Sequence, residues 1–435
     1  MRDRTKEHEV SINKLLDDGA GFGIYDQREW HVLNSLPGET VQATLIKRRG
    51  GMRYGMAQHV SNPSNHRISP LEPDHFTSCS PWQIITAEHE DEMKLSFAQS
   101  LFPWLPSPLK EDLSIYSDHT QRTGYRNKME YSFYTDKETN LLSLCFFQRM
   151  GTAKIPIDSC ALASPAITYL SQQVLIFLRA LTTNSFHYKS LMIRATRDGA
   201  AQAMLFVKDL ETARFIFNEI PQHLSPVLHI IYSDHRSPAS VVTEKIGSDE
   251  IPILTETVCN SPLSYSPLGF FQVNLPIFET ALQDMRQYLH GESVTDLYCG
   301  VGTISIALAE SIHDAVLVEA DFKTGETIKK NITQNNLSDT YSSNIALAES
   351  SLDAISSKKT LIIDPPRAGL HHNVIRQILA TLPPRIIYLS CNPATQSRDC
   401  AQLLEKYTPI KAALYNFFPM TPHTESLVIL DRKAR

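Results

Sequence analysis

The segment that decides the fold is IIYLSCNP at residues 386–393, an apolar run that ends in a single cysteine and an Asn-Pro turn. Runs rich in isoleucine and tyrosine with turn residues behind them are typical of buried strands in a parallel sheet. Open α/β sheets bind ligands beyond the carboxyl ends of such strands. The pattern therefore predicts that Cys391 faces a cleft, although taken alone it would also fit the buried apolar role common for free cysteine.

Three other segments favour the cleft for Cys391. They are the turn DPPR at residues 364–367, the glycine turn CGVG at 299–302, and Glu425 in a loop flanked by prolines. Turns at the carboxyl ends of neighbouring strands in an α/β sheet lie around one crevice. We therefore expect these segments to form one site with Cys391.

The length of the chain indicates two or three domains. Its composition has no large excess of either charge. The chain has 435 residues, with 41 Lys and Arg against 47 Asp and Glu. That length allows each domain a hydrophobic core of its own. Because the balance is mildly acidic, a nucleic-acid partner would have to be bound by local basic patches.

No segment of the sequence predicts export or membrane insertion. No apolar run approaches the roughly 20 residues of a membrane span, and no apolar signal segment follows the N-terminal MRDR. Seven scattered cysteines, none paired at zinc-finger spacing, suit reduced thiols rather than a disulfide framework. We expect a cytoplasmic monomer without membrane contact and without an obligate protein partner.

Residues 256–435 alternate strand-like and helix-like segments, which predicts a doubly wound α/β domain with a mainly parallel sheet. We expect the last two strands to form a hairpin. The expected strands span 293–297, 315–319, 342–346, 360–364, 385–391, 410–417 and 426–431, and the expected helices span 303–311, 322–336 and 395–407.

Residues 1–70 alternate short strand-like runs with glycine turns such as GAGFG at 19–23, which predicts a small OB-like β-barrel. The hairpin KRRGGMR at 47–53 carries four cations, and phosphate binding and simple solvation explain it equally well. The segments DGAGFG at 18–23, LPGE at 36–39 and PSNHRISP at 63–70 resemble a TRAM domain. That resemblance favours RNA as the partner.

Residues 71–255 predict a central α+β domain. Alternation in YRNKMEYSF at 125–133 places the apolar residues on one face of a strand and the polar residues on the other. The polar face either contacts RNA or is only solvated, and the pattern favours solvation. Apolar residues at helical spacing over 87–101 predict a helix within about 87–105. We expect this helix to pack on the domain formed by residues 256–435.

The segment DLYCGVGT at 296–303 has a strand followed by a Gly-x-Gly turn that opens a helix. Glu319 ends the next predicted strand, where a carboxylate can accept hydrogen bonds from ribose hydroxyls. The combination predicts an adenosine ligand, either a dinucleotide or S-adenosylmethionine. The absence of the third glycine of the dinucleotide fingerprint disfavours the first.

Asp364 follows the expected strand at 360–363, and the two prolines behind it stiffen the turn. Asp before proline is also a common turn starter without further function. An acid followed by arginine suits the polar edge of a uracil ring, whereas enzymes that methylate exocyclic amines usually have Asn-Pro-Pro-Tyr here. Glu425 opens the last strand, and it fits either a base or an ordinary exposed acid.

Together these segments resemble the RNA uracil-C5-methyltransferase family, whose members use S-adenosylmethionine and often begin with a TRAM domain. The matching segments are FFQVN at 270–274, DLYCGVG at 296–302, DPPRAGL at 364–370, SCNPAT at 390–395, RD at 398–399 and HTES at 423–426. The resemblance implies a Rossmann-like class I methyltransferase domain. It also implies that Cys391 is the nucleophile, that Glu425 is the base, and that the cofactor or target base is held by Gln272, Tyr298, Glu319 and Asp364, with Thr303 and Asn344 as further candidates.

The chemistry of uracil agrees with these roles. Carbon 5 becomes nucleophilic when a thiolate adds at carbon 6, and its proton must later be removed by a base. The TRAM-like segment favours 23S ribosomal RNA as the substrate, with the transfer-RNA T-loop as the alternative. Cytosine methylation, and an inactive RNA-binding or assembly factor, are the competing functions.

Members of the family often carry an iron–sulfur cluster on four cysteines. Here only Cys79 and Cys160 correspond to that set. Two thiolates are too few to hold the cluster, so we expect it to be absent and expect no metal site.

Overall fold

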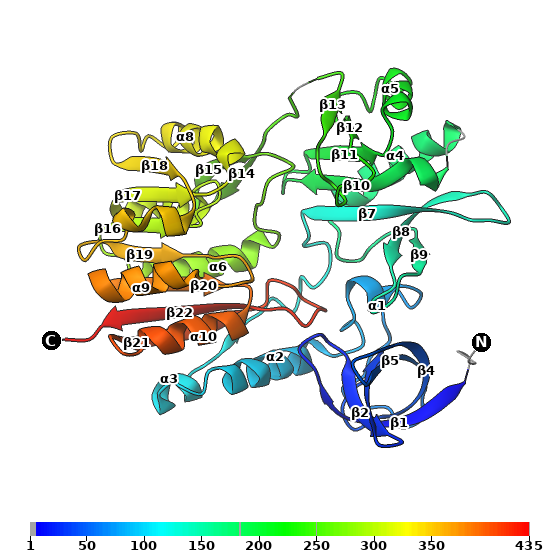
Figure 1. Ribbon diagram of the computed structural model, residues 1–435, viewed down its shortest axis with the longest axis horizontal. Helices are drawn as coiled ribbons and strands as arrows, with labels where there is room; N and C mark the ends of the chain where they lie inside the picture. Colours follow the sequence, from blue (N-terminus) through cyan, green and yellow to red (C-terminus); the bar gives the residue numbers. More distant parts are fainter. Residues whose placement is uncertain (1–5, 182–183, 249, 435) are drawn as a thin grey trace. The chain divides into compact units, whose positions relative to one another are not determined.

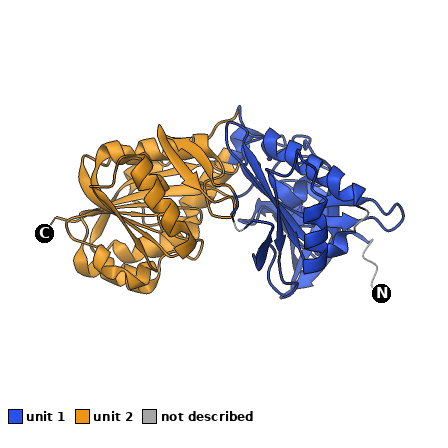
Figure 2. Ribbon diagram, turned by 90° about the horizontal axis from the view of Figure 1, so that it is seen from above, with its two compact units in different colours: residues 1–90, 120–251, 419–422 blue, residues 91–119, 252–418, 423–435 orange. Residues whose placement is uncertain are grey.

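The computed structural model describes residues 6–181, 184–248 and 250–434. The chain forms two compact units (Figure 2). Unit 1 contains residues 1–90, 120–251 and 419–422, and unit 2 contains residues 91–119, 252–418 and 423–435. The division into domains at 1–70, 71–255 and 256–435 stays a prediction.

Unit 1 begins with a closed five-stranded barrel in the order β1-β2-β3-β5-β4, as predicted (Figure 1). Side chains alternate along the strands, so that Val10, Ile12, Trp30 and Val41 fill the interior. The strands are β1 (Glu7–Leu15), β2 (Gly21–Tyr25), β3 (Arg28–Leu33), β4 (Thr40–Arg49) and β5 (Met52–Val60).

The glycine turn expected at 19–23 is in part a strand, because β2 begins at Gly21. A Cβ atom on Gly21 would lie 2.2 Å from Ser35 Oγ, and one on Gly23 would lie 2.3 Å from the carbonyl oxygen of Ser11. Glycine is therefore required here by the close approach of neighbouring chain segments in a narrow barrel rather than by a turn.

A seven-stranded sheet in the order β13-β12-β11-β10-β7-β8-β9 forms the rest of unit 1. In β7 the buried Met129, Tyr131 and Phe133 alternate with Lys128 and Glu130, as the pattern predicted. The elements are β7 (Lys128–Thr135), β8 (Leu142–Phe147), β9 (Lys154–Ile157), β10 (Tyr188–Ala195), β11 (Ala201–Val207), β12 (Leu228–Tyr232), β13 (Glu244–Ile246), α1 (Phe76–Cys79), α4 (Pro165–Ala180), α5 (Leu210–Asn218) and the 3₁₀ helix η1 (Ser185–His187).

Unit 2 contains an eight-stranded sheet in the order β18-β17-β16-β19-β20-β22-β21-β6. The first five strands are parallel, and β22 runs antiparallel to both β20 and β21, which gives the predicted hairpin. The strands are β6 (Ile115–Tyr116), β16 (Glu292–Leu297), β17 (Ile312–Glu319), β18 (Tyr341–Ile345), β19 (Thr360–Ile363), β20 (Arg385–Ser390), β21 (Tyr407–Tyr415) and β22 (Glu425–Arg432), with a separate pair β14 (Leu254–Val258) and β15 (Ser261–Tyr265).

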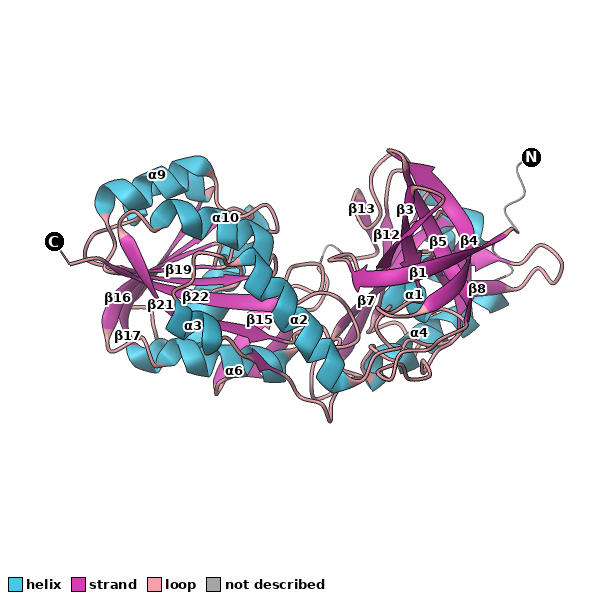
Figure 3. Cartoon of the chain, turned by 90° about the horizontal axis from the view of Figure 1, so that it is seen from below, coloured by secondary structure: helices cyan, strands magenta, loops and turns pink. Residues whose placement is uncertain are grey.

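Helices cover both faces of this sheet (Figure 3), as expected for a doubly wound fold. Ile362 and Ile387 pack with residues of α6, α7 and α8, whereas Leu361 and Ile386 pack with residues of α9 and α10. The helices are α2 (Ala87–Leu101), α3 (Ser107–Glu111), α6 (Leu275–Arg286), α7 (Thr303–Ala307), α8 (Gly325–Gln334), α9 (His372–Thr381), α10 (Pro393–Leu403), η2 (Ala309–Ser311), η3 (Phe322–Thr324), η4 (Ala348–Ser350) and η5 (Leu352–Ala354). Helices α6 and α9 were not predicted from the sequence.

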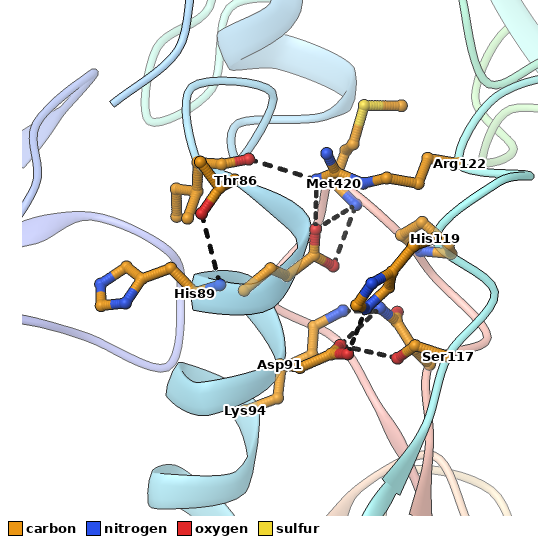
Figure 4. A network of polar contacts seen from close by, with 12 residues as sticks. Thr86, His89, Asp91, Lys94, Ser117, His119, Arg122 and Met420 are labelled. Atoms are coloured by element: carbon orange, nitrogen blue, oxygen red, sulfur yellow. Dashed lines mark hydrogen bonds and ion pairs between the residues drawn. The ribbon is translucent and has the colours of Figure 1, made fainter. Parts of the chain in front are cut away.

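Helix α2 has its first turn in unit 1 and its remainder in unit 2. In unit 1, Glu90 accepts a hydrogen bond from Arg122 at 2.8 Å, and in unit 2, Asp91 accepts one from Ser117 at 2.6 Å and lies 2.7 Å from His119 Nε2 (Figure 4). Beyond these contacts, apolar residues of the 98–113 segment pack on β21, among them Ala98, Phe102 and Leu105 against Ala412 and Leu414. Among the described helices, none has the length and apolar character to span a membrane.

A buried ion pair links the residue before β4 to the segment after β5. Glu39, 1 % exposed, accepts hydrogen bonds from Arg67 at 2.6 and 2.7 Å and from the backbone N–H groups of Leu36 and Ser64 at 2.7 and 3.0 Å. Arg67 also donates to Asn34 Oδ1 at 3.1 Å.

We expect Glu39→Ala to destabilise the barrel by about 3–5 kcal/mol, because it leaves the Arg67 guanidinium and two backbone donors without their acceptor. Glu9→Ala is the matched control, since exposed Glu9 accepts a hydrogen bond from Gln42 on the barrel surface and its loss should cost within about 0.5 kcal/mol. Thermal unfolding with hydrogen exchange of the barrel amides measures both. Equal effects of the two substitutions would contradict the structural role of the pair.

Candidate active site

The candidate residues gather at one edge of the unit 2 sheet. Strands β16, β17, β19 and β20 are parallel, so their carboxyl ends meet at the same edge. Tyr298, Glu319, Asp364 and Cys391 each lie at or directly after the end of one of these strands. This edge is where ligands bind in open α/β sheets.

The turn after β16 has three residues with positive φ, Tyr298 at 62°, Gly300 at 58° and Gly302 at 84°. A left-handed conformation is strained for a bulky residue such as tyrosine, and such strain is concentrated at ligand sites. A Cβ atom on Gly302 would lie 2.8 Å from Ile306 Cδ1, whereas one on Gly300 would meet open space. Gly302 is therefore needed for packing, and Gly300 leaves room next to the backbone.

Glu319 ends β17 and holds the glycine turn from the neighbouring strand. Its Oε2 accepts a hydrogen bond from Gly300 N at 2.9 Å, and its Oε1 accepts one from Asp321 N at 2.8 Å. On the other side of the turn, buried Asn331 donates to the carbonyl oxygen of Val301 at 2.9 Å. Nothing in the sequence analysis identified Asn331, whose contacts come from a separate helix.

Asp296 lies under the same turn and is completely buried. Its Oδ2 accepts a hydrogen bond from Ser305 at 2.6 Å, while its Oδ1 has no hydrogen-bond partner among the described residues. Burial raises the pKa of Asp296 to about 7. When Asp296 ionises, it places a negative charge beneath the glycine turn.

Asp364 follows β19 and is joined by Gln272 from the segment before α6. Gln272 Nε2 donates to Asp364 Oδ2 at 3.3 Å, so the structure brings together two candidates 92 residues apart in sequence. Burial, followed by the charge of Asp296, raises the pKa of Asp364 to about 7. A positively charged ligand at this edge would favour ionisation of both acids.

Cys391 and Glu425 face each other across the antiparallel pair β20 and β22. Ser390 pairs with Ser426, and one step beyond this pair the register places Cys391 opposite Glu425. Buried Gln396 of α10 fixes the pairing, because its Nε2 donates to the carbonyl oxygens of Tyr388 and Ser426 and its Oε1 accepts from Ser426 Oγ at 2.6 Å. Gln396 could not be recognised from the sequence, because no local motif marks it.

Burial and nearby acids determine the ionisation of this pair. Burial, followed by the charges of Glu425 and Asp364, raises the pKa of the Cys391 thiol to about 11, while Arg367 opposes the rise. Burial likewise raises the pKa of Glu425 well above its usual value. Glu425 Oε2 has no hydrogen-bond partner among the described residues, so the carboxyl group is free to exchange a proton with a ligand.

The turn at 364–370 is anchored by the residues that follow Cys391. Asn392 Nδ2 and Thr395 Oγ1 donate to the carbonyl oxygen of Arg367 at 2.9 and 3.2 Å. Buried Asp399 accepts from Leu370 N at 2.8 Å. Arg367 was recognised within the DPPR motif, but its electrostatic effect on Cys391 appears only in the structure.

Two candidates lie further from these contacts. Thr303 is the buried first residue of α7, directly after Gly302. Asn344 is exposed on β18, where it pairs with Val318 one position before Glu319, and its Nδ2 donates to Ser351 Oγ at 3.1 Å.

A comparison with protein families finds that residues 92–433 match the tRNA (Uracil-5-)-methyltransferase family. The chain belongs to this family. The predicted enzyme class, an S-adenosylmethionine-dependent RNA uracil-5-methyltransferase, is thereby confirmed.

Similar proteins extend over nearly the whole chain. The 23S rRNA (uracil(1939)-C(5))-methyltransferase RlmD of Vibrio parahaemolyticus is 23 % identical over 98 % of this chain and 97 % of its own length. The protein of that name from Shewanella sp. strain ANA-3 is 28 % identical over 97 % and 95 %. The tRNA (uracil-54, C5)-methyltransferase of Pyrococcus abyssi, solved with S-adenosyl-L-homocysteine, has a TM-score of 0.73 at 20 % identity, over 97 % of this chain and 100 % of that one. This last likeness confirms the methyltransferase fold.

The site fits the cofactor of this uracil-5-methyltransferase family. Open space beside Gly300 admits a ligand against the backbone, and the Glu319 carboxylate at the same turn can accept hydrogen bonds from ribose hydroxyls. The buried acids Asp296 and Asp364 favour a ligand with positive charge.

Substitution of each glycine by alanine tests a different role, which is packing of the turn for Gly302 and space for a ligand for Gly300. Gly302→Ala should destabilise unit 2 by about 2–5 kcal/mol, because left-handed backbone and overpacking costs combine. Gly300→Ala should cost only about 1–2 kcal/mol, since its methyl group meets no protein atom. We expect Gly300→Ala nevertheless to lose most affinity for S-adenosyl-L-homocysteine in calorimetric titrations. Unchanged affinity with Gly300→Ala would mean that the cofactor lies elsewhere.

The ionisation of Cys391 can be followed by its alkylation with iodoacetamide. A rise from an ordinary pKa of 9.0 to about 11 leaves about 100-fold less thiolate near neutral pH, and reactivity should increase up to the higher pKa. Arg367→Met should raise the pKa further and slow alkylation, whereas Arg376→Met on the exposed face of α9 should not. Mass spectrometry of the Cys391 peptide across pH gives the rates. Equal profiles for both variants would exclude Arg367 from the thiol environment.

Proposed function

We propose that this chain forms 5-methyluridine in RNA through a covalent bond between Cys391 and uracil. The observation that supports it most is the pairing of β20 with β22, which puts a thiol opposite a buried carboxyl group. One oxygen of that carboxyl group has no hydrogen-bond partner among the described residues. Uracil methylation at carbon 5 needs one nucleophile and one base on the same ring. Cys391 and Glu425 supply this pair.

In the first step the Cys391 thiol releases its proton to water, and the thiolate sulfur adds to carbon 6 of uracil. The C–S bond turns the ring into an enolate whose carbon 5 is nucleophilic. Arg367 favours the thiolate, because its positive charge opposes the acids that raise the pKa of Cys391. When bound, S-adenosylmethionine supplies the methyl group that carbon 5 accepts.

In the last step Glu425 removes the remaining proton from carbon 5. The electrons of that C–H bond restore the double bond between carbons 5 and 6, and the C–S bond to Cys391 breaks. A carboxylate with a raised pKa is a stronger base than an exposed one, and burial raises the pKa of Glu425. The unpartnered Oε2 is available to take the proton.

Six residues are proposed to hold the cofactor or the target base. Glu319 would accept hydrogen bonds from the ribose, and Asp364 with Gln272 would lie at the cofactor's charged end or at the polar edge of uracil. The full set is Gln272, Tyr298, Thr303, Glu319, Asn344 and Asp364. The contact between Gln272 and Asp364 supports their acting together.

For the substrate we propose 23S ribosomal RNA, with transfer RNA as the alternative. Relatives that match nearly the whole chain are named as 23S rRNA methyltransferases, while the similar solved structure is a tRNA enzyme. The barrel, proposed as a TRAM domain, adds a cation beside an aromatic ring, with Lys47 Nζ 5.0 Å from the Tyr54 ring. Such surfaces bind RNA phosphates and bases. A cytoplasmic location and a monomeric state remain predictions.

Glu425→Gln should still form the adduct and transfer the methyl group but fail to release the product, because an amide cannot take the carbon 5 proton. We expect turnover to fall by about 10²–10⁴-fold and a protein–RNA band to survive denaturing electrophoresis, labelled by the methyl donor. Sequencing the trapped RNA identifies the substrate uridine.

The double variant Cys391→Ala/Glu425→Gln is the control, and it should give no band while retaining S-adenosyl-L-homocysteine binding. Normal turnover of Glu425→Gln without an adduct would refute its role as the base. No methylation of any cellular RNA by the unaltered protein would favour an inactive RNA-binding factor instead.

A further inference from the structure

Unit 1 contains a cluster of metal-ligating side chains that the methyltransferase reaction does not use. One ligand atom each of Glu72, Cys79 and Cys160 lies within 4.8 Å of the other two. Cys79 ends the short helix α1, Glu72 precedes it by one loop, and Cys160 comes from the segment after β9. Segments distant in sequence therefore converge on one point.

His75 lies against the same cluster. Its Nδ1 is 3.9 Å from Cys79 Sγ, and its Nε2 is 3.7 Å from Glu72 Oε1. The side chain is 10 % exposed, so water has little access to the ring. An imidazole here supplies a fourth ligand once the ring turns one nitrogen toward the two sulfurs.

The carboxylate of Glu72 is held in place by neighbours that are not ligands. Its Oε1 accepts from Ala161 N at 2.7 Å and its Oε2 from Gln83 Nε2 at 3.1 Å. Gln83 also donates to Ser80 Oγ at 2.7 Å, next to Cys79. Such contacts around ligand side chains orient them and strengthen metal binding.

We propose that Glu72, His75, Cys79 and Cys160 bind a single zinc ion. Thiolate, imidazole and carboxylate are all zinc ligands, and two sulfurs select zinc over harder cations such as Mg²⁺. Bond lengths of about 2.0–2.3 Å in a tetrahedral site imply ligand–ligand distances of about 3.3–3.8 Å. The ligand atoms of Glu72, Cys79 and Cys160 lie within 4.8 Å of one another, so these side chains would move together by about 1 Å around the ion. His75 would turn one of its two nitrogens toward the same point.

The same residues do not fit the iron–sulfur cluster that the family resemblance would imply. A four-iron cluster is commonly held by four thiolates, and this cluster of side chains offers two. A single ion needs four donor atoms in all, which two sulfurs, one oxygen and one nitrogen provide. The expectation that the chain has no metal site is therefore replaced by a site for a mononuclear ion.

Zinc would cross-link the 72–79 segment to the segment that carries Cys160 within unit 1. Binding free energy of a structural zinc ion adds to folding free energy. We therefore expect the ion to stabilise unit 1 and not to take part in methyl transfer.

The test is the metal content of the full-length protein after equilibration with buffered Zn²⁺ and removal of free ions. We expect elemental mass spectrometry to find one zinc ion per chain. Cys79→Ser and Cys160→Ser should each lose it, and His75→Ala should weaken binding at least tenfold. Cys145→Ala is the matched control, because it removes a buried thiol of the same unit outside the cluster.

Cobalt substitution gives a second readout that does not depend on activity. The Co²⁺-loaded protein should show a thiolate-to-cobalt charge-transfer band, which should be absent from either cysteine variant and unchanged in Cys145→Ala. A zinc chelator should lower the melting temperature of the unaltered protein but not of the Cys79→Ser/Cys160→Ser variant.

Several results would overturn the proposal. They are less than a tenth of an equivalent of zinc, equal zinc in the cysteine variants, a Cys79–Cys160 disulfide in the freshly purified protein, or iron with acid-labile sulfide in place of zinc.

Discussion

The site depends on the antiparallel pairing of β22 with β20. In a sheet whose other central strands are parallel, a strand inserted in the opposite direction begins at the edge where its neighbours end. Glu425 therefore lies opposite Cys391, although 34 positions, 425 minus 391, separate them in the chain. A parallel strand would have placed its first residue at the far edge. Gln396 fixes this register from below with buried hydrogen bonds to both strands.

Burying Asp296, Asp364, Glu425 and a thiol at one edge has an electrostatic consequence. Arg367 is the cation that opposes the rise in pKa of Cys391 and of Glu425, and the pKa of each of these acidic groups is nonetheless raised. Burial and mutual repulsion disfavour their charged forms. A ligand that brings positive charge reverses this effect, because it stabilises the carboxylates. A cationic ligand at this edge would therefore also convert the acids to their basic forms.

The sequence alone predicted which candidate residues lie at the carboxyl end of a strand. Glu319, Asp364 and Cys391 each end or follow a buried run, and parallel strand ends share an edge. Glu425 needed the family resemblance as well, because its place depends on the direction of β22. Asn331 and Gln396 were missed, since a buried amide in a helix has no sequence pattern until its partners are known. The strand β2 was misread because close chain approach selects glycine as readily as a turn does.

The same limit explains the cluster at Glu72, His75, Cys79 and Cys160. A count of cysteines can predict only a site whose ligands are all thiolates, and two cysteines are too few for an iron–sulfur cluster. The folded chain adds a carboxylate and an imidazole from the loop before α1, and these ligand types were not counted. A mononuclear ion accepts such mixed donors, whereas a four-iron cluster commonly uses four thiolates. A site with two thiolates, one carboxylate and one imidazole therefore suits a different metal from a site with four thiolates.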